Sequence, residues 1–408
     1  MKTKMDKIPE LKSLLNDGEQ IPIRNYPKPS GGSDVKEFSS QDILIYKRLD
    51  FSRIDTFITP VESFFIRNHL NYPDADVSDW RLKLEGCFRN ECMLSMEEIK
   101  KFEQMTKVFH VECTGNQRSE KTIIDKFKIL YRYSSILSLN KLMKMLDPMQ
   151  WKWTLSVLRA DGIRGGNLIS NGVFTGVRLF DVLKKYPLTD NAKEIVFEGM
   201  DKGHDTMMQR LGKTNINYAR SFEIEELKIY DPILCFEMNG NPLRIEHGFP
   251  LRLIIPGMYG GEQIKWLGRI IATSEKYRGY YQTEYYGYKI NGETVPVHEV
   301  RPKAVVIKVL KKNMEITAYG VAWRGLSPLD RIEVSVDNMN TWDPASLLCR
   351  EIDNSWIFWK YEIPQRMKDV VTIIPRAFCV NGDCQPLKPD EYSSAYGNNA
   401  VVSAVVKI

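Results

Sequence analysis

The sequence lacks several features that mark common classes of redox and membrane protein. None of its seven cysteines belongs to a Cys-x-x-Cys pair, which argues against structural zinc and against thioredoxin-type chemistry. Its five histidines form no haem-attachment motif, so no haem is expected. No apolar run reaches the roughly 18 residues that a transmembrane helix needs. Neither an apolar secretory segment nor a twin-arginine pair follows Met1, and we therefore expect a cytoplasmic protein.

Composition narrows the remaining possibilities. At 408 residues the chain is long enough for two domains, and its 43% apolar and 27% charged residues are typical of a globular protein. A net charge of +5 is too small to indicate binding to nucleic acid. Cys379 and Cys384 flank a turn and could approach each other, but two reduced thiols are the favoured interpretation for a cytoplasmic protein.

One short stretch carries the clearest chemical signal. Residues 108–111 (Val-Phe-His-Val) have the composition of a buried strand, and a turn at 114–116 places Cys113 at the end of that strand. Thiolate is the ligand that soft metals prefer, and the guanidinium of Arg118 suits a small oxyanion. Taken alone, a lone cysteine in a strand is more often a small core residue than a metal ligand.

Several motifs in a fixed order change that interpretation. They are Phe64-Phe-Ile-Arg-Asn-His-Leu70, Cys113-Thr-Gly-Asn-Gln-Arg118, Glu198-Gly-Met-Asp201, Glu237-Met-Asn-Gly240, His247-Gly-Phe-Pro-Leu-Arg252, and Ile255-Pro-Gly257 with Ile264-Lys-Trp-Leu-Gly268. In this order they resemble the molybdenum-cofactor domain of the sulfite oxidase family, which also includes assimilatory nitrate reductases. The resemblance runs from about residue 55 to the C-terminus.

The expected fold class is α+β, with two domains after an N-terminal arm. We expect the arm over residues 1–55, a mixed α+β molybdopterin-binding domain over 56–294 and an immunoglobulin-like β-sandwich over 295–408. Short strands separated by turn residues are typical of such a sandwich. The resemblance implies that this last domain mediates a homodimer.

Local patterns also predict individual elements. Ser95 and Glu98 form a capping-box pattern, which predicts a helix of about two to three turns through Met105. Residues 167–183 predict a loop rich in glycine and asparagine, followed by a helix that ends at Lys185. β-branched residues predict strands at 193–198 and 251–255, among others.

The resemblance implies a molybdenum held by a pterin dithiolene, with Cys113 as the sole protein ligand. Arg67, Arg118 and Tyr286 match catalytic positions near the metal, although packing within a run of tyrosines is the alternative interpretation of Tyr286. The positions that match cofactor-binding residues of the family are Arg67, Asn68, His69, Asp201, His247, Arg252, Gln263 and Lys265. Asp201 suits the ring amines of the pterin, whereas His247, Arg252 and Lys265 suit its phosphate.

The implied reaction is a two-electron oxygen-atom transfer, with sulfite as the favoured substrate and a separate carrier as electron acceptor. Departures from the family pattern leave the substrate open. Gln117 and Tyr396 stand where many members have arginines, and Arg164 falls where sulfite oxidases have a tryptophan. A reductase of nitrate, of another small oxyanion or of a sulfoxide is the alternative, and a non-catalytic cofactor- or partner-binding protein is an alternative of another class.

The segment 119–162 looks different from the family. It carries eight lysine and arginine residues beside apolar residues at near-helical spacing. A solvated pair of surface helices is the favoured interpretation, and a docking face for an acidic electron acceptor or an anionic membrane surface is the alternative. A scaffold that binds nucleic acid or acidic lipid is the least favoured function.

Overall fold

The computed structural model describes residues 9–24, 46–73, 76–117, 167–203, 215–290, 293–349, 352, 354–365, 369–389 and 396–408. Arg118, Arg164 and the whole basic segment 119–162 lie outside these residues, so what the sequence predicts for them stays a prediction. Within the described residues, no helix is both long and apolar enough to cross a membrane.

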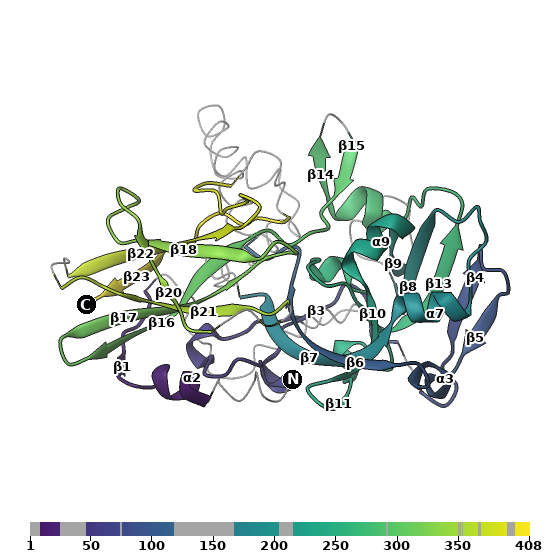
Figure 1. Cartoon of the computed structure of the whole chain (residues 1–408), viewed down its shortest axis with the longest axis horizontal. Coiled ribbons are helices and arrows are strands. Elements are labelled where there is room, and N and C mark those ends of the chain that lie inside the picture. Colours follow the sequence, from purple (N-terminus) through teal and green to yellow (C-terminus); the bar gives the residue numbers. More distant parts are fainter. Residues whose placement is uncertain are drawn as a thin grey trace, which may run out of the picture.

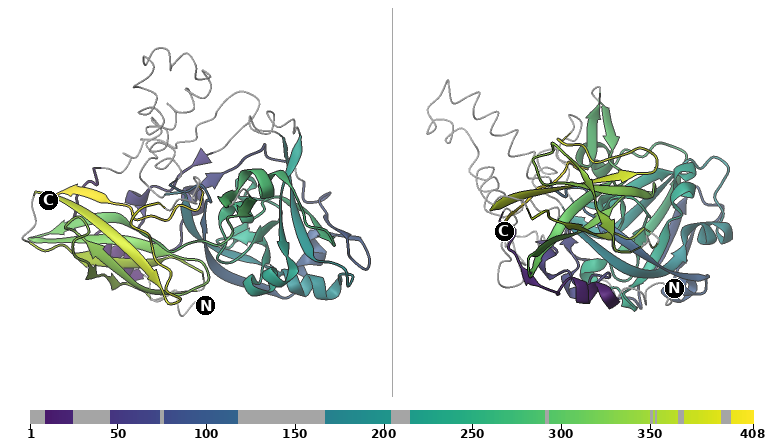
Figure 2. Two further views of the ribbon diagram at one scale, coloured as in Figure 1. Left: turned by 90° about the horizontal axis from the view of Figure 1, so that it is seen from above. Right: turned by 60° about the vertical axis from the view of Figure 1, so that its left-hand side comes forward.

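The described residues form two units that lie side by side along the long axis of the molecule (Figure 1, Figure 2). We call residues 46–296 the central unit and residues 303–408 the C-terminal unit. Residues 9–24 pack on the C-terminal unit, where β1 (Glu19–Gln20) pairs with β16 (Lys303–Lys312). Residues 9–24 of the predicted N-terminal arm are therefore held against the C-terminal unit, whereas residues 46–55 belong to the central unit.

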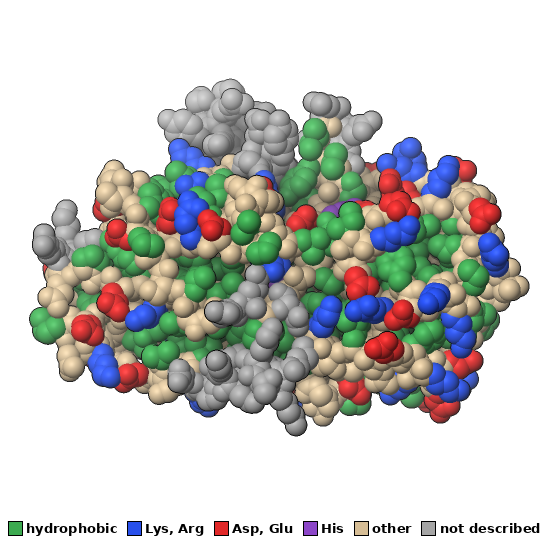
Figure 3. All heavy atoms as spheres, in the orientation of Figure 1, with side chains coloured by type: hydrophobic (Ala, Val, Ile, Leu, Met, Phe, Trp, Pro, Cys, Tyr) green, Lys and Arg blue, Asp and Glu red, His purple; other side chains and the backbone are tan. Residues whose placement is uncertain are grey.

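The described residues are mostly sheet, with few helices. The short helices are α2 (Pro9–Leu14), α3 (Met96–Lys100), α7 (Leu179–Lys185) and α9 (Ile224–Tyr230). On the face shown in Figure 3, basic and acidic side chains are interspersed over both units, in keeping with the small net charge. The α+β class and the predicted domain boundaries stay predictions.

The central unit is built on two five-stranded sheets. Their strands are β4 (Leu82–Gly86), β5 (Cys92–Leu94), β6 (Gln104–Glu112), β7 (Ile169–Arg178), β8 (Glu194–Gly203), β9 (Ile216–Glu223), β10 (Ile233–Met238), β11 (Asn241–Pro242), β12 (Arg252–Ile254) and β13 (Leu267–Thr273). One sheet has the order β11-β10-β7-β6, with β12 paired to β10, and the other has the order β5-β4-β13-β8-β9. Two small antiparallel pairs complete the unit, β2 (Tyr46–Lys47) with β3 (Ile66–Arg67) and β14 (Gly287–Ile290) with β15 (Glu293–Pro296).

The prediction for the helix at Ser95 was right about its start and wrong about its length. Ser95 and Glu98 form the capping box, since each side chain bonds the backbone N–H of the other residue. The helix ends at Lys100, however, and not at Met105. From Gln104 onward the backbone pairs with β7, so this part of the chain is already strand.

The loop predicted in the first half of residues 167–183 is also wrong, because most of it is strand β7. A Cβ atom on Gly176 would lie 2.2 Å from the carbonyl oxygen of Leu234, so only glycine permits this approach to β10. The side chain of Asn171 donates to the carbonyl oxygen of Phe57. The glycine and asparagine therefore mark close contacts of a buried strand. The helix that follows, α7, ends at Lys185 as predicted.

Two antiparallel sheets pack face to face in the C-terminal unit. Their further strands are β17 (Glu315–Trp323), β18 (Leu329–Ser335), β19 (Asp343–Pro344), β20 (Ser346–Leu347), β21 (Ile357–Glu362), β22 (Val370–Cys379) and β23 (Ala404–Lys407). The sheet orders are β1-β16-β17-β21-β20 and β19-β18-β22-β23, and apolar residues of both sheets share one core. Cys379 is buried and Cys384 is partly buried, and no disulfide joins them in the described structure.

The sheet that contains β16 is buried on both of its faces. Ala304, Val306 and Val309 face the core of the C-terminal unit, whereas Val305 and Ile307 belong to the large core of the central unit. This is why residues 303–310 read as a nearly unbroken apolar run instead of an alternating one. The two units are therefore joined by a shared apolar core.

A buried polar contact crosses the same boundary. Glu112, the last residue of β6, accepts hydrogen bonds from Lys303 Nζ (2.8 Å) and from Trp323 Nε1 (2.8 Å), and none of the three side chains is exposed to solvent. Nearby, the backbone N–H of His110 donates to the carbonyl oxygen of Asn354 (2.8 Å). Side chains of neighbouring residues in a strand point to opposite faces. The Glu112 side chain therefore anchors β6 to the C-terminal unit on the face opposite the one that carries the Cys113 side chain.

We expect Lys303→Met to destabilise the protein strongly, because it leaves the Glu112 carboxylate buried without its counter-ion. The expected cost is about 3–5 kcal/mol, measured by urea-induced unfolding. Adding Glu112→Gln should recover most of the loss, since it removes the unpaired charge. Lys312→Met, which breaks an exposed pair with Asp17, is the control and should leave the midpoint unchanged. An unchanged midpoint for Lys303→Met would contradict the structural role of this contact.

Candidate active site

A cavity of about 690 Å³, partly open to solvent, lies beside the end of β6 in the central unit. Ten of the residues that the sequence singles out line it, and they come from six separate parts of the chain. They are Arg67, Asn68, His69, Cys113, Asp201, His247, Arg252, Gln263, Lys265 and Tyr286. Arg118 is the remaining candidate and lies outside the described residues. The structure thus brings these side chains together, while the role of each stays a proposal.

Cys113 is held at the cavity by the backbone on both of its sides. Its N–H donates to the carbonyl oxygen of Leu168 (2.9 Å), and its own carbonyl oxygen accepts from the N–H of Asn116 (2.8 Å). The Asn116 side chain also donates to Glu112 and accepts from the Leu168 N–H. Cys113 is only 8% exposed. A thiol on so rigid a loop is suited to ligating a metal that enters the cavity.

Two glycines let the opposite wall approach this loop. A Cβ atom on Gly261 would lie 2.5 Å from Thr114 Oγ1, and one on Gly260 would lie 3.1 Å from the carbonyl oxygen of Glu112. In the structure the N–H of Gly261 donates to Thr114 Oγ1 (3.2 Å). Glycine suits both positions because a side chain would press on the Thr114 hydroxyl or on the Glu112 carbonyl group.

Several buried polar atoms of the cavity lining have no hydrogen-bond partner among the described residues. They include Asp201 Oδ1, His247 Nε2, Arg252 Nε and Gln263 Oε1. Buried polar groups are rarely left without partners, because each costs free energy. The set contains both acceptors and a guanidinium donor, so it fits a ligand that carries amines, ring acceptors and a negative charge.

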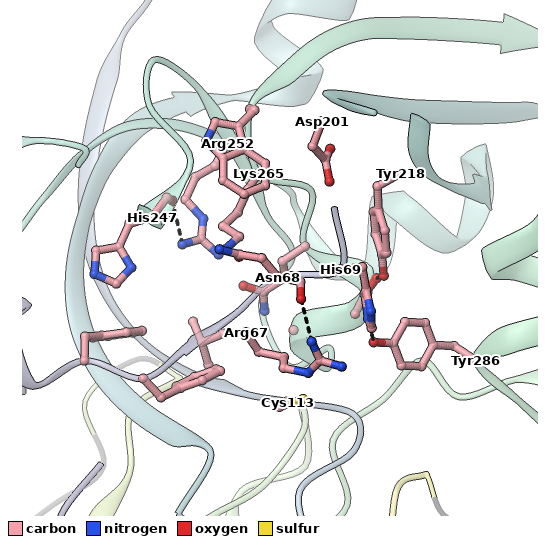
Figure 4. A pocket seen from close by; sticks show the side chains of 17 residues that line it. Arg67, Asn68, His69, Cys113, Asp201, Tyr218, His247, Arg252, Lys265 and Tyr286 are labelled. Carbon is pink, nitrogen blue, oxygen red and sulfur yellow. Dashed lines mark hydrogen bonds between the residues drawn. The ribbon is translucent and has the colours of Figure 1, made fainter. Parts of the chain in front are cut away.

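The cavity is electrostatically unusual at the end where Arg252 and Lys265 lie together (Figure 4). Burial, together with the nearby charge of Arg252, lowers the pKa of Lys265 to about 7. Burial raises the pKa of Asp201 to about 7, which Lys265 opposes. Burial also lowers the pKa of His247 to about 3, so this imidazole is neutral at physiological pH. As the pH rises through 7, Lys265 and Asp201 both lose protons and this end loses positive charge.

Arg67 lies closer to Cys113 than this cationic end does in the same view (Figure 4). Its guanidinium donates to the carbonyl oxygen of Asn68, whose side-chain oxygen accepts from Lys265 Nζ. On the far side, the Tyr286 hydroxyl and His69 Nε2 form a hydrogen bond. The cavity therefore has a guanidinium near its thiol and a second cluster of cations away from it.

Both interpretations of Tyr286 have support. Its hydroxyl reaches His69 in the cavity, while its ring packs against Tyr285 and Tyr396 with centroids 4.9 Å away in each case. Gln117, like Tyr396, is buried, but neither is among the residues that line the cavity. Tyr396 packs on the ring of Tyr286 beside the cavity, whereas the side-chain oxygen of Gln117 is buried without a hydrogen-bond partner among the described residues.

Sequence reasoning missed Tyr218, which also lines the cavity. Its hydroxyl donates to the carbonyl oxygen of Gly261 (2.7 Å), and its ring stacks on that of His69 at 5.8 Å with an interplanar angle of 5°. Tyr218 lies in β9 with no recognisable motif around it. The Gly260-Gly261 pair, by contrast, lies just before the motif Ile264-Lys-Trp-Leu-Gly268, so this motif could have drawn attention to it.

Comparison with known proteins agrees with this geometry. A sequence profile of the family described as "Oxidoreductase molybdopterin binding domain" matches residues 69–281, a little over half of the chain. The chain is 28% identical over 370 residues to the mitochondrial sulfite oxidase of Mus musculus, a match that covers 85% of this chain and 60% of the mouse protein. It is 28% identical over 344 residues to the NAD(P)H nitrate reductase of Hordeum vulgare, which covers 75% of this chain and 34% of that protein. The chain thus spans less than two-thirds of the length of these relatives.

A solved structure shares the fold. The sulfane dehydrogenase SoxCD from Paracoccus pantotrophus superposes with a TM-score of 0.68 at 20% sequence identity, covering 94% of this chain and 89% of that one. With the family profile, the relatives and the shared fold in agreement, the chain belongs to the family of molybdopterin-binding oxidoreductases that includes sulfite oxidases and nitrate reductases, and its cofactor is a molybdenum–molybdopterin.

Proposed function

We propose that the protein oxidises sulfite to sulfate and passes the electrons to a separate carrier. The observation that carries the proposal is the presence of one rigidly held thiol, Cys113, in the same cavity as the guanidinium of Arg67. A relative whose match covers 85% of this chain is a sulfite oxidase by name. A small oxyanion is the substrate that such a guanidinium binds well.

The residues of the cavity fit the cofactor. Cys113 would ligate the molybdenum, Asp201 Oδ1 would accept from ring amines, and Arg252 with Lys265 would bind the phosphate. The unpaired atoms of His247 and Gln263 would gain partners from the same group. When bound, the cofactor supplies two-electron oxygen-atom transfer.

The protein's own part is to bind and orient the anion and to exclude water. Arg67 supplies positive charge near the thiol, and the buried walls strengthen its attraction for an anion because the local dielectric is low. Burial raises the pKa of Tyr286 well above its usual range, so its hydroxyl stays protonated and able to hydrogen-bond. Arg118 is proposed as a second guanidinium for the substrate.

Nitrate reduction is the second candidate, because a nitrate reductase matches this chain with the same percentage identity as the sulfite oxidase. Assays of sulfite with ferricyanide and of nitrate with a reduced viologen distinguish the two. We expect turnover with sulfite. Turnover with nitrate alone would overturn the choice of substrate, and molybdenum without turnover in either assay would indicate a non-catalytic protein.

We also propose an oligomeric state and a cellular compartment for the protein. The two packed sheets of the C-terminal unit are proposed to be the immunoglobulin-like domain through which two copies associate, and the compartment is proposed to be the cytoplasm. Sedimentation of the purified protein tests the first point: a dimer is expected, and a monomer at micromolar concentration would contradict it. Cell fractionation tests the second.

Cys113→Ser should abolish sulfite oxidation and loosen the metal, because a serine hydroxyl is a poor ligand for a soft metal. The measurements are the sulfite–ferricyanide rate and the molybdenum content of the purified variant. Cys235→Ser is the control, since this thiol is buried in β10 and does not line the cavity. Full activity in the Cys113 variant would refute the assignment of the ligand.

Anion binding at the Lys265 end should weaken as the pH rises through 7, since Lys265 loses its charge while Asp201 gains one. For the apoprotein and sulfate, whose own charge is constant in this range, we expect an affinity up to about tenfold lower at pH 8 than at pH 6. Isothermal titration calorimetry measures it. Lys265→Met should remove most of the pH dependence of sulfate affinity. Lys202→Met, which removes the same charge from an exposed position, should leave the pH dependence in place. An affinity that does not depend on pH would contradict the proposed role.

A further inference from the structure

One pair of buried charges lies next to the cavity without lining it. Arg220 in β9 and Glu262, in the turn Gly260–Glu262, both have 0% side-chain exposure. Arg220 Nε donates to Glu262 Oε2 (2.8 Å), and Arg220 Nη2 donates to Glu262 Oε1, so the pair is a two-pronged ion pair. Removing two charges from water is costly, and well-packed apolar residues would often serve stability equally well.

Arg220 makes a further contact that the ion pair does not need. Its Nη1 donates to the carbonyl oxygen of Tyr281, which also accepts the backbone N–H of Tyr286 (3.3 Å). The Arg220 guanidinium also lies 5.9 Å from the centroid of the Tyr286 ring. Arg220 therefore holds the backbone that carries Tyr286, through one shared oxygen atom.

Glu262 extends the same contact to the opposite wall. It lies between Gly261 and Gln263, which both line the cavity. The carbonyl oxygen of Gly261 accepts from the hydroxyl of Tyr218, and the Tyr218 ring stacks on His69. Since His69 also bonds to the Tyr286 hydroxyl, the contacts that begin at Arg220 reach this hydrogen bond from both sides.

We propose that Arg220, paired with Glu262, is a positioning residue that sets the hydrogen bond between Tyr286 and His69 in the cavity. Arg220 makes no hydrogen bond to the side chain of Tyr286 or His69. It acts through the carbonyl oxygen of Tyr281 and through the Gly260–Glu262 turn. The kinetic part of this inference rests on the proposed function. The structural part does not.

The structural test is the ¹⁵N resonance of His69 Nε2 in the purified, oxidised protein. The chain has five histidines, so the imidazole spectrum is sparse enough to assign with a His69→Asn variant. Tyr286→Phe defines the position of the resonance when the hydrogen bond is lost. Arg220→Lys keeps the charge beside Glu262 but cannot make the fork and reach Tyr281 at once. We expect it to move the resonance most of the way to the Tyr286→Phe position.

Two further variants separate positioning from mere stability. Arg220→Met combined with Glu262→Met replaces the ion pair by apolar side chains, which should preserve the fold and still shift His69. Arg269→Lys alters an ion-paired arginine on β13 that does not line the cavity, and it should leave the resonance in place. Thermal unfolding of each variant shows that it is folded.

The kinetic test is a double-mutant cycle on sulfite oxidation. Arg220→Lys alone should lower kcat/KM by about tenfold, and it should add almost nothing in the Tyr286→Phe background, because both changes remove the same hydrogen bond. Losses that multiply in the double variant would overturn the inference, as would a His69 resonance unmoved in both folded Arg220 variants. Absence of any sulfite turnover would count against the proposed function alone, since the His69 shift does not depend on it.

Discussion

The structure depends most on the contact of Glu112 with Lys303 and Trp323. Through these hydrogen bonds Glu112, at the end of β6, is joined to Lys303 of β16 and Trp323 of β17, which are paired with each other in the C-terminal unit. Cys113 follows directly and faces the cavity, so the same strand end is fixed from behind and offers its thiol in front. The C-terminal unit thus supports the candidate active site, although none of its described residues lines the cavity.

The cavity combines rigid walls with incomplete hydrogen bonding. Its walls come from distant segments that are joined by glycine contacts, by the Arg220–Glu262 pair and by the tyrosines around His69. Against these walls, atoms of Asp201 and Arg252 are buried without partners in the described residues. A bound cofactor would supply those partners, so its binding should also stabilise the fold. This division is what a cofactor enzyme requires, since the protein orients the group that performs the chemistry.

The motifs predicted the lining of the cavity well, because lining residues such as Arg67 and Lys265 belong to short motifs that occur in a recognisable order. Prediction failed where one residue type serves two purposes. A glycine such as Gly176 favours the prediction of a loop, yet here it allows β7 to approach β10 closely within the core. Arg220 and Glu262 carry no local signal at all, because they lie 42 residues apart and become a pair only through the fold. The end of α3 was mispredicted for a similar reason. Gln104 pairs with β7, a strand far away in the sequence, and so belongs to the sheet.

The assignment of the cavity depends on the proposal that the Cys113 sulfur is a ligand of molybdenum. X-ray absorption at the molybdenum edge of the purified protein tests it most directly, because the method counts the sulfur neighbours of the metal. We expect one sulfur neighbour beyond those of the pterin dithiolene, and we expect the Cys113→Ser protein to lack it. An identical sulfur coordination with and without Cys113 would contradict it.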